Sequence, residues 1–64
     1  MKLEEIVSIA VRTAYCMDLH TYEEIFGKGT RSKWELQQEN FTKWFTHLDS
    51  GNQKRFMKYA LNRE

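Results

Sequence analysis

Apolar residues recur every three or four positions along nearly the whole chain, and strict alternation of apolar and polar residues never extends beyond a few positions. The first spacing is that of one face of an α-helix, whereas the second would indicate a β-strand. No proline, low-complexity tract or internal repeat interrupts the pattern. In the segment 3–17 the apolar residues form one broad stripe, made of Leu3, Ile6, Val7, Ala10, Val11, Ala14 and Met17. The sequence therefore predicts helices alone.

Three short motifs predict where helices begin. TYEE at Thr21, SKWE at Ser32 and SGNQ at Ser50 each place a hydroxyl three residues before a Glu or Gln. In such a capping box the two side chains satisfy each other's free backbone amides at a helix start. Gly27 stands where a left-handed cap would end a short helix. Together with the apolar spacing, these motifs predict helices over about residues 2–17, 22–26, 33–48 and 51–62.

The length of the chain, 64 residues, allows one small domain. Chains of this size bury only about 60% of their unfolded surface, so their cores need large side chains. Nine aromatic residues supply them here. The predicted core combines the stripe of segment 3–17 with Trp34, Phe41, Trp44, Phe45 and Phe56. We expect an all-α fold, a compact three- to four-helix bundle formed by residues 1–64 as a single domain.

Several classes of protein are disfavoured by the composition. Cys16 is the only cysteine and cannot form an internal disulfide, which argues against a disulfide-stapled secreted scaffold. Glu4, Glu5 and Arg12 interrupt the first apolar positions, unlike the core of a signal peptide. No apolar run approaches the roughly 20 residues that cross a bilayer, and segment 51–62 lacks the large apolar face of a membrane-surface anchor. We therefore expect a complete, cytoplasmic protein without a membrane partner.

The segment 26–35, FGKGTRSKWE, combines two glycines and three cations ahead of a predicted helix. A phosphate-binding P-loop requires GxxxxGK[ST] after a buried strand, and this segment has neither the spacing nor the strand. We interpret it as a connector between helices. Contact with a phosphate at the amino terminus of the following helix is the alternative, because helix dipoles attract anions there.

Catalytic and metal-binding residue types are few. Besides carboxylates, the chain offers Cys16, His20 and His47, whereas a zinc site needs four ligands. There is no serine elbow, and a chain of this length has little room for a pocket of roughly 300 Å³ or more, the size that ligand sites use. We expect no enzymatic activity, no cofactor and no metal site.

Charge is distributed unevenly along the chain. Residues 1–26 carry two cations and five acids, a net charge of −3, whereas residues 27–64 carry eight cations and four acids, a net charge of +4. This asymmetry predicts either an anionic partner for the second half or pairing between the two halves. The candidate basic residues are Lys28, Arg31, Lys33, Lys43, Lys54, Arg55 and Lys58.

A nucleic-acid-binding function is the alternative that these cations define, since phosphate neutralisation needs clustered cations. The predicted order of a short helix, a glycine-containing turn and a longer helix is that of a helix-turn-helix. The outer side of the longer helix carries Asn40, Lys43 and His47, with Gln37 and Gln38 at its margins, and Asn, Gln and Lys are side-chain types that contact base edges. The turn is longer than the three or four residues that such motifs use.

Four apolar residues fall outside the predicted core faces and are candidates for binding a partner. Ile9 and Cys16 lie opposite the main stripe, Tyr15 lies at its edge, and Leu36 lies on the outer side of its helix. Single exposed apolar residues are normal, but a line of them indicates contact with another protein or a second copy of the chain. We interpret the chain as a non-enzymatic small helical interaction protein that binds and regulates or inhibits a larger macromolecular partner. The regulatory part of this interpretation is an analogy from size and fold class.

Overall fold

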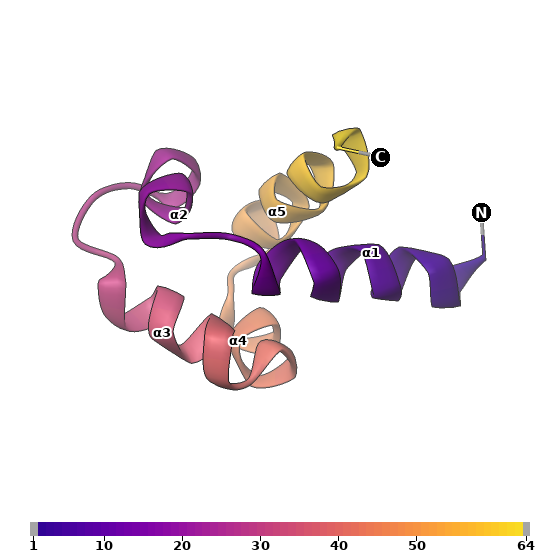
Figure 1. Cartoon of the computed structure of the whole chain (residues 1–64), viewed down its shortest axis with the longest axis horizontal. Helices are drawn as coiled ribbons and strands as arrows, with labels where there is room; N and C mark the ends of the chain where they lie inside the picture. The colour runs from indigo at the N-terminus through magenta and orange to yellow at the C-terminus, as the bar shows by residue number, and fades with distance from the viewer. Residues whose placement is uncertain (1, 64) are drawn as a thin grey trace.

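The computed structural model describes residues 2–63 and is helical throughout, with no strand among them. Five helices lie within this range: α1 (Leu3–Tyr15), α2 (Leu19–Phe26), α3 (Arg31–Glu39), α4 (Phe41–His47) and α5 (Ser50–Asn62). The all-α class is confirmed, and the number of helices exceeds the predicted three to four by at least one. Figure 1 shows α2, α3 and α4 gathered at one end, with the amino-terminal half of α1 extending away from them.

Asn40 divides the helix predicted over residues 33–48 into α3 and α4. Its backbone is extended, with φ −152° and ψ 91°, and its N–H donates to the Leu36 carbonyl at 2.8 Å to complete α3. Its side-chain oxygen accepts from the Lys43 amide at 3.1 Å and begins α4. Asn is among the best N-cap residues because its side chain replaces a missing helical acceptor. One residue thus ends one helix and starts the next, and the prediction of a continuous helix was wrong.

The predicted capping boxes are not the caps that the structure uses. The Asp18 side chain accepts from the Thr21 amide at 2.8 Å, and the Asp49 side chain accepts from the Asn52 amide at 2.8 Å. Both helices therefore begin directly after an aspartate. Helix α2 starts three residues before its predicted position, and α5 starts one residue before its predicted position. Aspartate caps as well as serine does, and its charge also interacts favourably with the helix dipole. The cap of α3 is Thr30 instead of Ser32, and it makes no side-chain cap hydrogen bond.

Gly27 ends α2 as predicted. Its φ of 107° lies in a region that residues with a side chain rarely adopt, and its N–H donates to the Glu23 carbonyl at 2.8 Å. The turn between α2 and α3 is further closed by the Thr30 hydroxyl, which donates to the Gly27 carbonyl at 2.8 Å. The connector interpretation of this segment agrees with these contacts.

Trp44 lies at the centre of the core. Its indole Nε1–H donates to the Tyr22 hydroxyl at 2.9 Å, and both side chains are fully buried. Phe56 meets the indole edge-on at a centroid distance of 5.1 Å. Among the predicted core aromatics, Trp44 and Phe56 are buried, whereas Trp34, Phe41 and Phe45 are partly buried and pack against the cluster. Rings from α2, α4 and α5 therefore meet around one side chain.

Helix α3 holds the carboxyl end of α1 by hydrogen bonds. Trp34 Nε1 donates to the Met17 carbonyl at 2.9 Å, and Gln38 Nε2 donates to the Ala14 carbonyl at 2.8 Å. Met17 lies just beyond α1, and the Ala14 carbonyl also accepts from the Met17 amide at 3.2 Å, so the side chains of α3 add further bonds where α1 ends. Gln37 is fully buried beside Gln38 and accepts from it at 3.1 Å. The end of α1 that contacts the core is thus its carboxyl end.

We expect Tyr22→Phe to lower the free energy of unfolding by about 1–3 kcal/mol, because it leaves the buried indole N–H of Trp44 without an acceptor. Urea unfolding followed by tryptophan fluorescence measures the change. Tyr15→Phe is the matched control, since Tyr15 is half exposed and should lose almost nothing. Equal effects of the two substitutions would contradict the role given to the Tyr22 hydroxyl.

The Asp18 cap predicts a pH dependence of stability. Hydrogen bonds from the backbone and side chain of Thr21 hold the pKa of the Asp18 carboxyl below its usual value. A lowered folded-state pKa means that the carboxylate stabilises the fold above its unfolded pKa of about 4, and that this contribution is lost as the pH falls through the folded-state value. Asp18→Asn keeps a capping oxygen that does not titrate, so its melting temperature should fall less than that of the wild type between about pH 5 and pH 2. An equal fall in melting temperature for the two proteins over this pH range would refute the role given to the Asp18 carboxylate.

Candidate functional site

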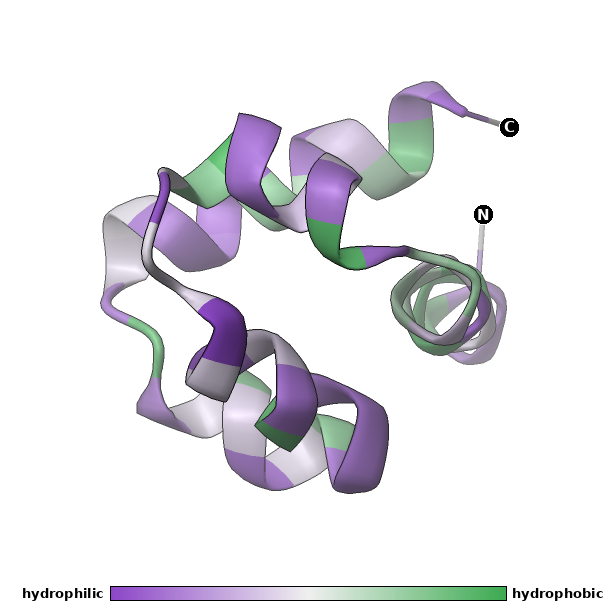
Figure 2. Ribbon diagram, turned by 60° about the vertical axis from the view of Figure 1, so that its left-hand side comes forward, coloured by the Kyte–Doolittle hydropathy of each residue, from purple (hydrophilic) through white to green (hydrophobic). Residues whose placement is uncertain are grey.

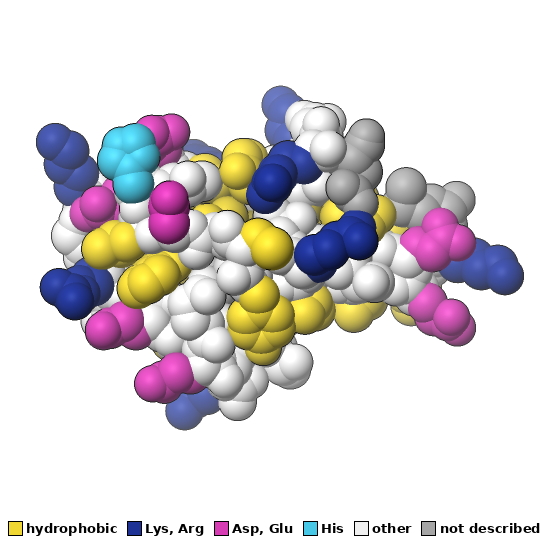
Figure 3. Space-filling model, viewed as in Figure 1, with side chains coloured by type: hydrophobic (Ala, Val, Ile, Leu, Met, Phe, Trp, Pro, Cys, Tyr) yellow, Lys and Arg dark blue, Asp and Glu magenta, His cyan; other side chains and the backbone are white. Residues whose placement is uncertain are grey.

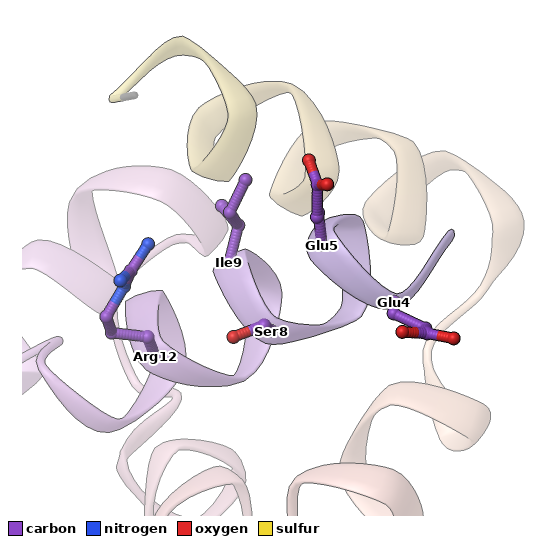
Figure 4. Close-up of a pocket in the computed structure, with 5 residues that line it drawn as sticks. All are labelled: Glu4, Glu5, Ser8, Ile9 and Arg12. Atoms are coloured by element: carbon purple, nitrogen blue, oxygen red, sulfur yellow. The ribbon is translucent and has the colours of Figure 1, made fainter. Parts of the chain in front are cut away.

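Of the four apolar residues predicted to bind a partner, two are exposed. Tyr15 is 50% exposed, and Cys16 is also exposed. Ile9 is only 8% exposed and belongs to the core, so the prediction that it faces away from the core was wrong. Figure 4 shows its side chain pointing from α1 toward α5. Leu36 is partly buried and packs against the core. Because α1 packs against both α3 and α5, its buried face is turned relative to the stripe that spacing predicts.

The amino-terminal half of the predicted core stripe lies at the surface. Leu3 is 75% exposed and Val7 is 50% exposed, whereas Ala10, Ala14 and Met17 farther along the chain are buried. Helix α1 has 13 residues and is therefore about 20 Å long, and in Figure 1 it runs along the longest axis of the molecule, with its amino-terminal half extending away from α2, α3 and α4. Helix α1 lies at the edge of the molecule in Figure 2, which views it nearly end-on. The core therefore covers only the carboxyl-terminal part of the apolar stripe of segment 3–17.

An apolar groove of about 280 Å³ adjoins the exposed part of α1. Helices α1, α4 and α5 all contribute to its walls. Its lining consists of Leu3, Ile6, Val7, Ala10, Phe41, Phe45 and Met57. Every one of these side chains is apolar. Apolar surface that is concave and open to solvent marks a site of contact with another molecule.

Four residues form an apolar row along α1, at intervals of four. They are Leu3, Val7, Val11 and Tyr15, of which Val11 is partly buried and the others are at least half exposed. Residues four apart are neighbours on one side of a helix, so the row is continuous. Figure 3 shows hydrophobic side chains following α1 in this way. The sequence analysis assigned Leu3, Val7 and Val11 to the core. The stripe is long relative to so small a core, and this could have indicated that part of it is exposed.

A polar row lies beside the apolar row on α1. It consists of Glu4, Ser8 and Arg12, again at intervals of four, with an acid at one end and a cation at the other. Glu4, Ser8 and Arg12, together with Glu5 and Ile9, line a shallow hollow of about 370 Å³, drawn in Figure 4. The surface of α1 therefore carries an apolar row and a row with opposite charges at separated positions.

Three of the side chains predicted to contact base edges are engaged within the chain, whereas Lys43 is exposed. Gln37 is buried, Gln38 donates to the Ala14 carbonyl, and Asn40 caps α4. Two of the candidate basic residues also have partners: Arg55 Nη1 donates to the Ile25 carbonyl at 3.2 Å, and Arg31 Nε lies 3.9 Å from the Glu35 carboxylate. The remaining basic candidates, Lys28, Lys33, Lys43, Lys54 and Lys58, are exposed. Figure 3 shows cationic and acidic side chains interspersed on the face that it presents.

Residues that could hold a metal ion do not form a group of three or more anywhere in residues 2–63. His20 Nδ1 lies 3.1 Å from the Glu24 carboxylate on the exposed side of α2. A further hollow of about 350 Å³, lined in part by Lys33, Leu36 and His47, mixes polar and apolar side chains. None of the helices over this range is long and apolar enough to span a membrane.

Comparison with known proteins adds no information about this surface. No protein-family model, curated protein or solved structure matches the chain. The geometry of the apolar groove and the two rows on α1 is therefore the basis for assigning a function.

The contrast between Ile9 and Val7 can be measured. We expect Ile9→Ala to lower the free energy of unfolding by about 2–5 kcal/mol, because it removes buried side-chain volume. Val7→Ala should cost less than about 1 kcal/mol, because half of that side chain already faces water. Urea unfolding of both variants tests the orientation of α1. A larger loss for Val7→Ala than for Ile9→Ala would show that α1 is rotated from the position described.

Proposed function

We propose that this chain is a non-enzymatic interaction protein that binds and regulates or inhibits a larger protein partner through the exposed face of α1. The observation that carries the proposal is the groove lined only by apolar side chains, beside which Leu3 and Val7 stand exposed. A small domain gains stability by burying such side chains, so their exposure next to a groove favours a role in binding.

An amphipathic helix of the partner is the kind of segment that suits this surface. Such a helix presents apolar side chains at positions i, i+3 or i+4 and i+7 and inserts them into a hydrophobic groove. Phe41, Phe45 and Met57 provide one wall, and α1 provides the other. Burying one large aliphatic side chain contributes about 1.5–3 kcal/mol. The charges of Glu4 and Arg12 beside the groove would orient the partner and raise its association rate.

The proposal assigns the chain no chemical step, because the groove that it uses is lined only by apolar side chains. A cytoplasmic location is part of the proposal, since the exposed free thiol of Cys16 stays reduced in that compartment. Covering a surface that the partner needs is the simplest way for so small a domain to inhibit a larger protein.

Nucleic-acid binding is the second candidate function. Lys28 and Lys33 are exposed at the start of α3, and Lys54 and Lys58 are exposed on α5, so phosphate contacts have side chains available at two places. The near-neutral charge of the whole chain, +1, and the internal use of Gln37 and Gln38 favour the protein partner instead.

Cross-linking from α1 tests the main proposal. A photoreactive residue at position 7, in a chain that is otherwise wild type, should capture one defined partner protein from the producing cells. Adding Leu3→Asp should reduce that capture at least about tenfold, because it places a charge in the apolar contact. Aspartate in the first turn of a helix is stable, so this variant should keep its fold, as circular dichroism would verify. Ser32→Asp is the matched control, an exposed acidic substitution in the first turn of α3.

Equal capture by Leu3→Asp and Ser32→Asp would overturn the assignment of α1 as the binding surface. Capture of nucleic acid that weakens steeply with added salt and ignores Leu3→Asp would favour the second candidate function, because phosphate contacts release about one counterion each.

A further inference from the structure

We propose that the hollow between α3, α4 and the start of α5 binds a free α-amino acid with an apolar side chain and holds it by both of its charged groups. The hollow has a volume of about 350 Å³, within the range of roughly 300–1,000 Å³ that small-molecule sites use. It shares no lining residue with the apolar groove beside α1, so the inference goes beyond the proposed function.

Three of the side chains that line the hollow are apolar. Leu36 comes from α3, Trp44 comes from α4, and Leu48 follows the last residue of α4. Leu36 and Leu48 are partly buried, and Trp44 is 1% exposed, so this part of the lining is largely withdrawn from solvent. An aliphatic side chain of a ligand would lose contact with water here, which is the main source of binding free energy for such a group.

A positive charge reaches the hollow from α3. Lys33 lies in the first turn of that helix and is exposed, and its side chain is part of the lining. Within residues 2–63, no carboxylate pairs with its ammonium group. Charge-assisted hydrogen bonds to a carboxylate are stronger than those between neutral groups. Lys33 is therefore the side chain that suits the carboxylate of a ligand.

The other polar side chains of the hollow offer acceptors. Asp49 Oδ1 accepts from the Asn52 amide at 2.8 Å, whereas Asp49 Oδ2 lies 3.5 Å from Asn52 Nδ2, which is too long for a strong bond and leaves that oxygen able to accept another. His47 Nδ1 donates to the Lys43 carbonyl at 2.7 Å, so Nε2 of the neutral ring is an acceptor. A carboxylate and an acceptor nitrogen suit the ammonium group of a ligand.

Opposite charges on separate elements select a ligand that carries both. Lys33 belongs to α3, and Asp49 is the N-cap of α5. A simple carboxylate would be repelled by Asp49 and a simple amine by Lys33, whereas an α-amino acid pairs with both. Exposed ion pairs each contribute little, so we expect a dissociation constant in about the millimolar range.

An NMR titration of the full, isotope-labelled chain with L-leucine up to about 20 mM tests the inference, because this range exceeds the expected dissociation constant. The methyl signals of Leu36 and Leu48 and the indole signal of Trp44 should shift, while the methyl signals of Leu3 and Val7 stay fixed. Glycine, which keeps both charges but has no apolar side chain, should bind at least about tenfold more weakly. N-acetyl-L-leucine lacks the ammonium and L-leucinamide lacks the carboxylate, so each should bind about threefold more weakly.

Two substitutions assign the charges of the ligand to residues. Lys33→Gln should weaken the binding of L-leucine about threefold and leave that of L-leucinamide unchanged, because this ligand has no carboxylate to pair. Asp49→Asn should weaken the binding of L-leucine about threefold without weakening that of N-acetyl-L-leucine, and asparagine preserves the cap of α5. Lys28→Gln and Asp18→Asn are the matched controls, an exposed lysine and a helix cap that lie outside the hollow and should leave the affinity unchanged.

The absence of shifts at Leu36, Leu48 and Trp44 with about 20 mM L-leucine would overturn the inference. Equal affinities for L-leucine and its two derivatives would overturn the pairing with both charges. Shifts centred on Leu3 and Val7 would overturn the placement of the site. Cross-linking from position 7 involves no residue of the hollow, so its result tests the proposed function separately.

Discussion

The hydrogen bond from the Trp44 indole to the Tyr22 hydroxyl, 2.9 Å long and fully buried, is the contact on which the rest of the structure depends. It joins α2 to α4, and the indole also lies within 5.1–6.2 Å of the rings of five aromatic residues. These residues are Tyr22, Phe26, Phe41, Phe45 and Phe56. Burial raises the pKa of the Tyr22 hydroxyl above its ordinary value of 10.0, so the neutral group that accepts the hydrogen bond from the indole N–H persists to a higher pH. Helices from the middle and the end of the chain are thereby fixed around one centre.

Helix α1 joins this centre only in part. Its contribution to the buried core is Ile9 with the two small residues Ala10 and Ala14, and α3 holds its carboxyl end through Trp34 and Gln38. The bulky aromatic side chains fill the core, so Leu3 and Val7 are not part of it and lie at the surface beside the groove. The same packing that completes the fold therefore leaves the apolar row of α1 uncovered. The surface proposed for binding is thus a consequence of how the core is filled.

Apolar spacing predicted the helical class and the burial of Trp44 and Phe56, and the glycine at position 27 predicted the end of α2. It could not predict the break at Asn40, because asparagine is tolerated inside a helix and the apolar spacing continues across it. Spacing also indicates which side of a helix is apolar but not how far the core extends along it, so Leu3 and Val7 were assigned to the interior and Ile9 to the surface. The buried position of Gln37 depends on its contact with Met17, 20 residues earlier in the chain, which no local pattern contains.

The most direct measurement is methyl NMR of the isotope-labelled chain with a soluble paramagnetic probe, which broadens the signals of methyl groups that lie at the surface. Because the core is filled without Leu3 and Val7, the methyl signals of these two residues should broaden strongly, while those of the buried Ile9 should broaden little. Strong broadening of the Ile9 signals, or protection of the Leu3 and Val7 signals, would contradict the account.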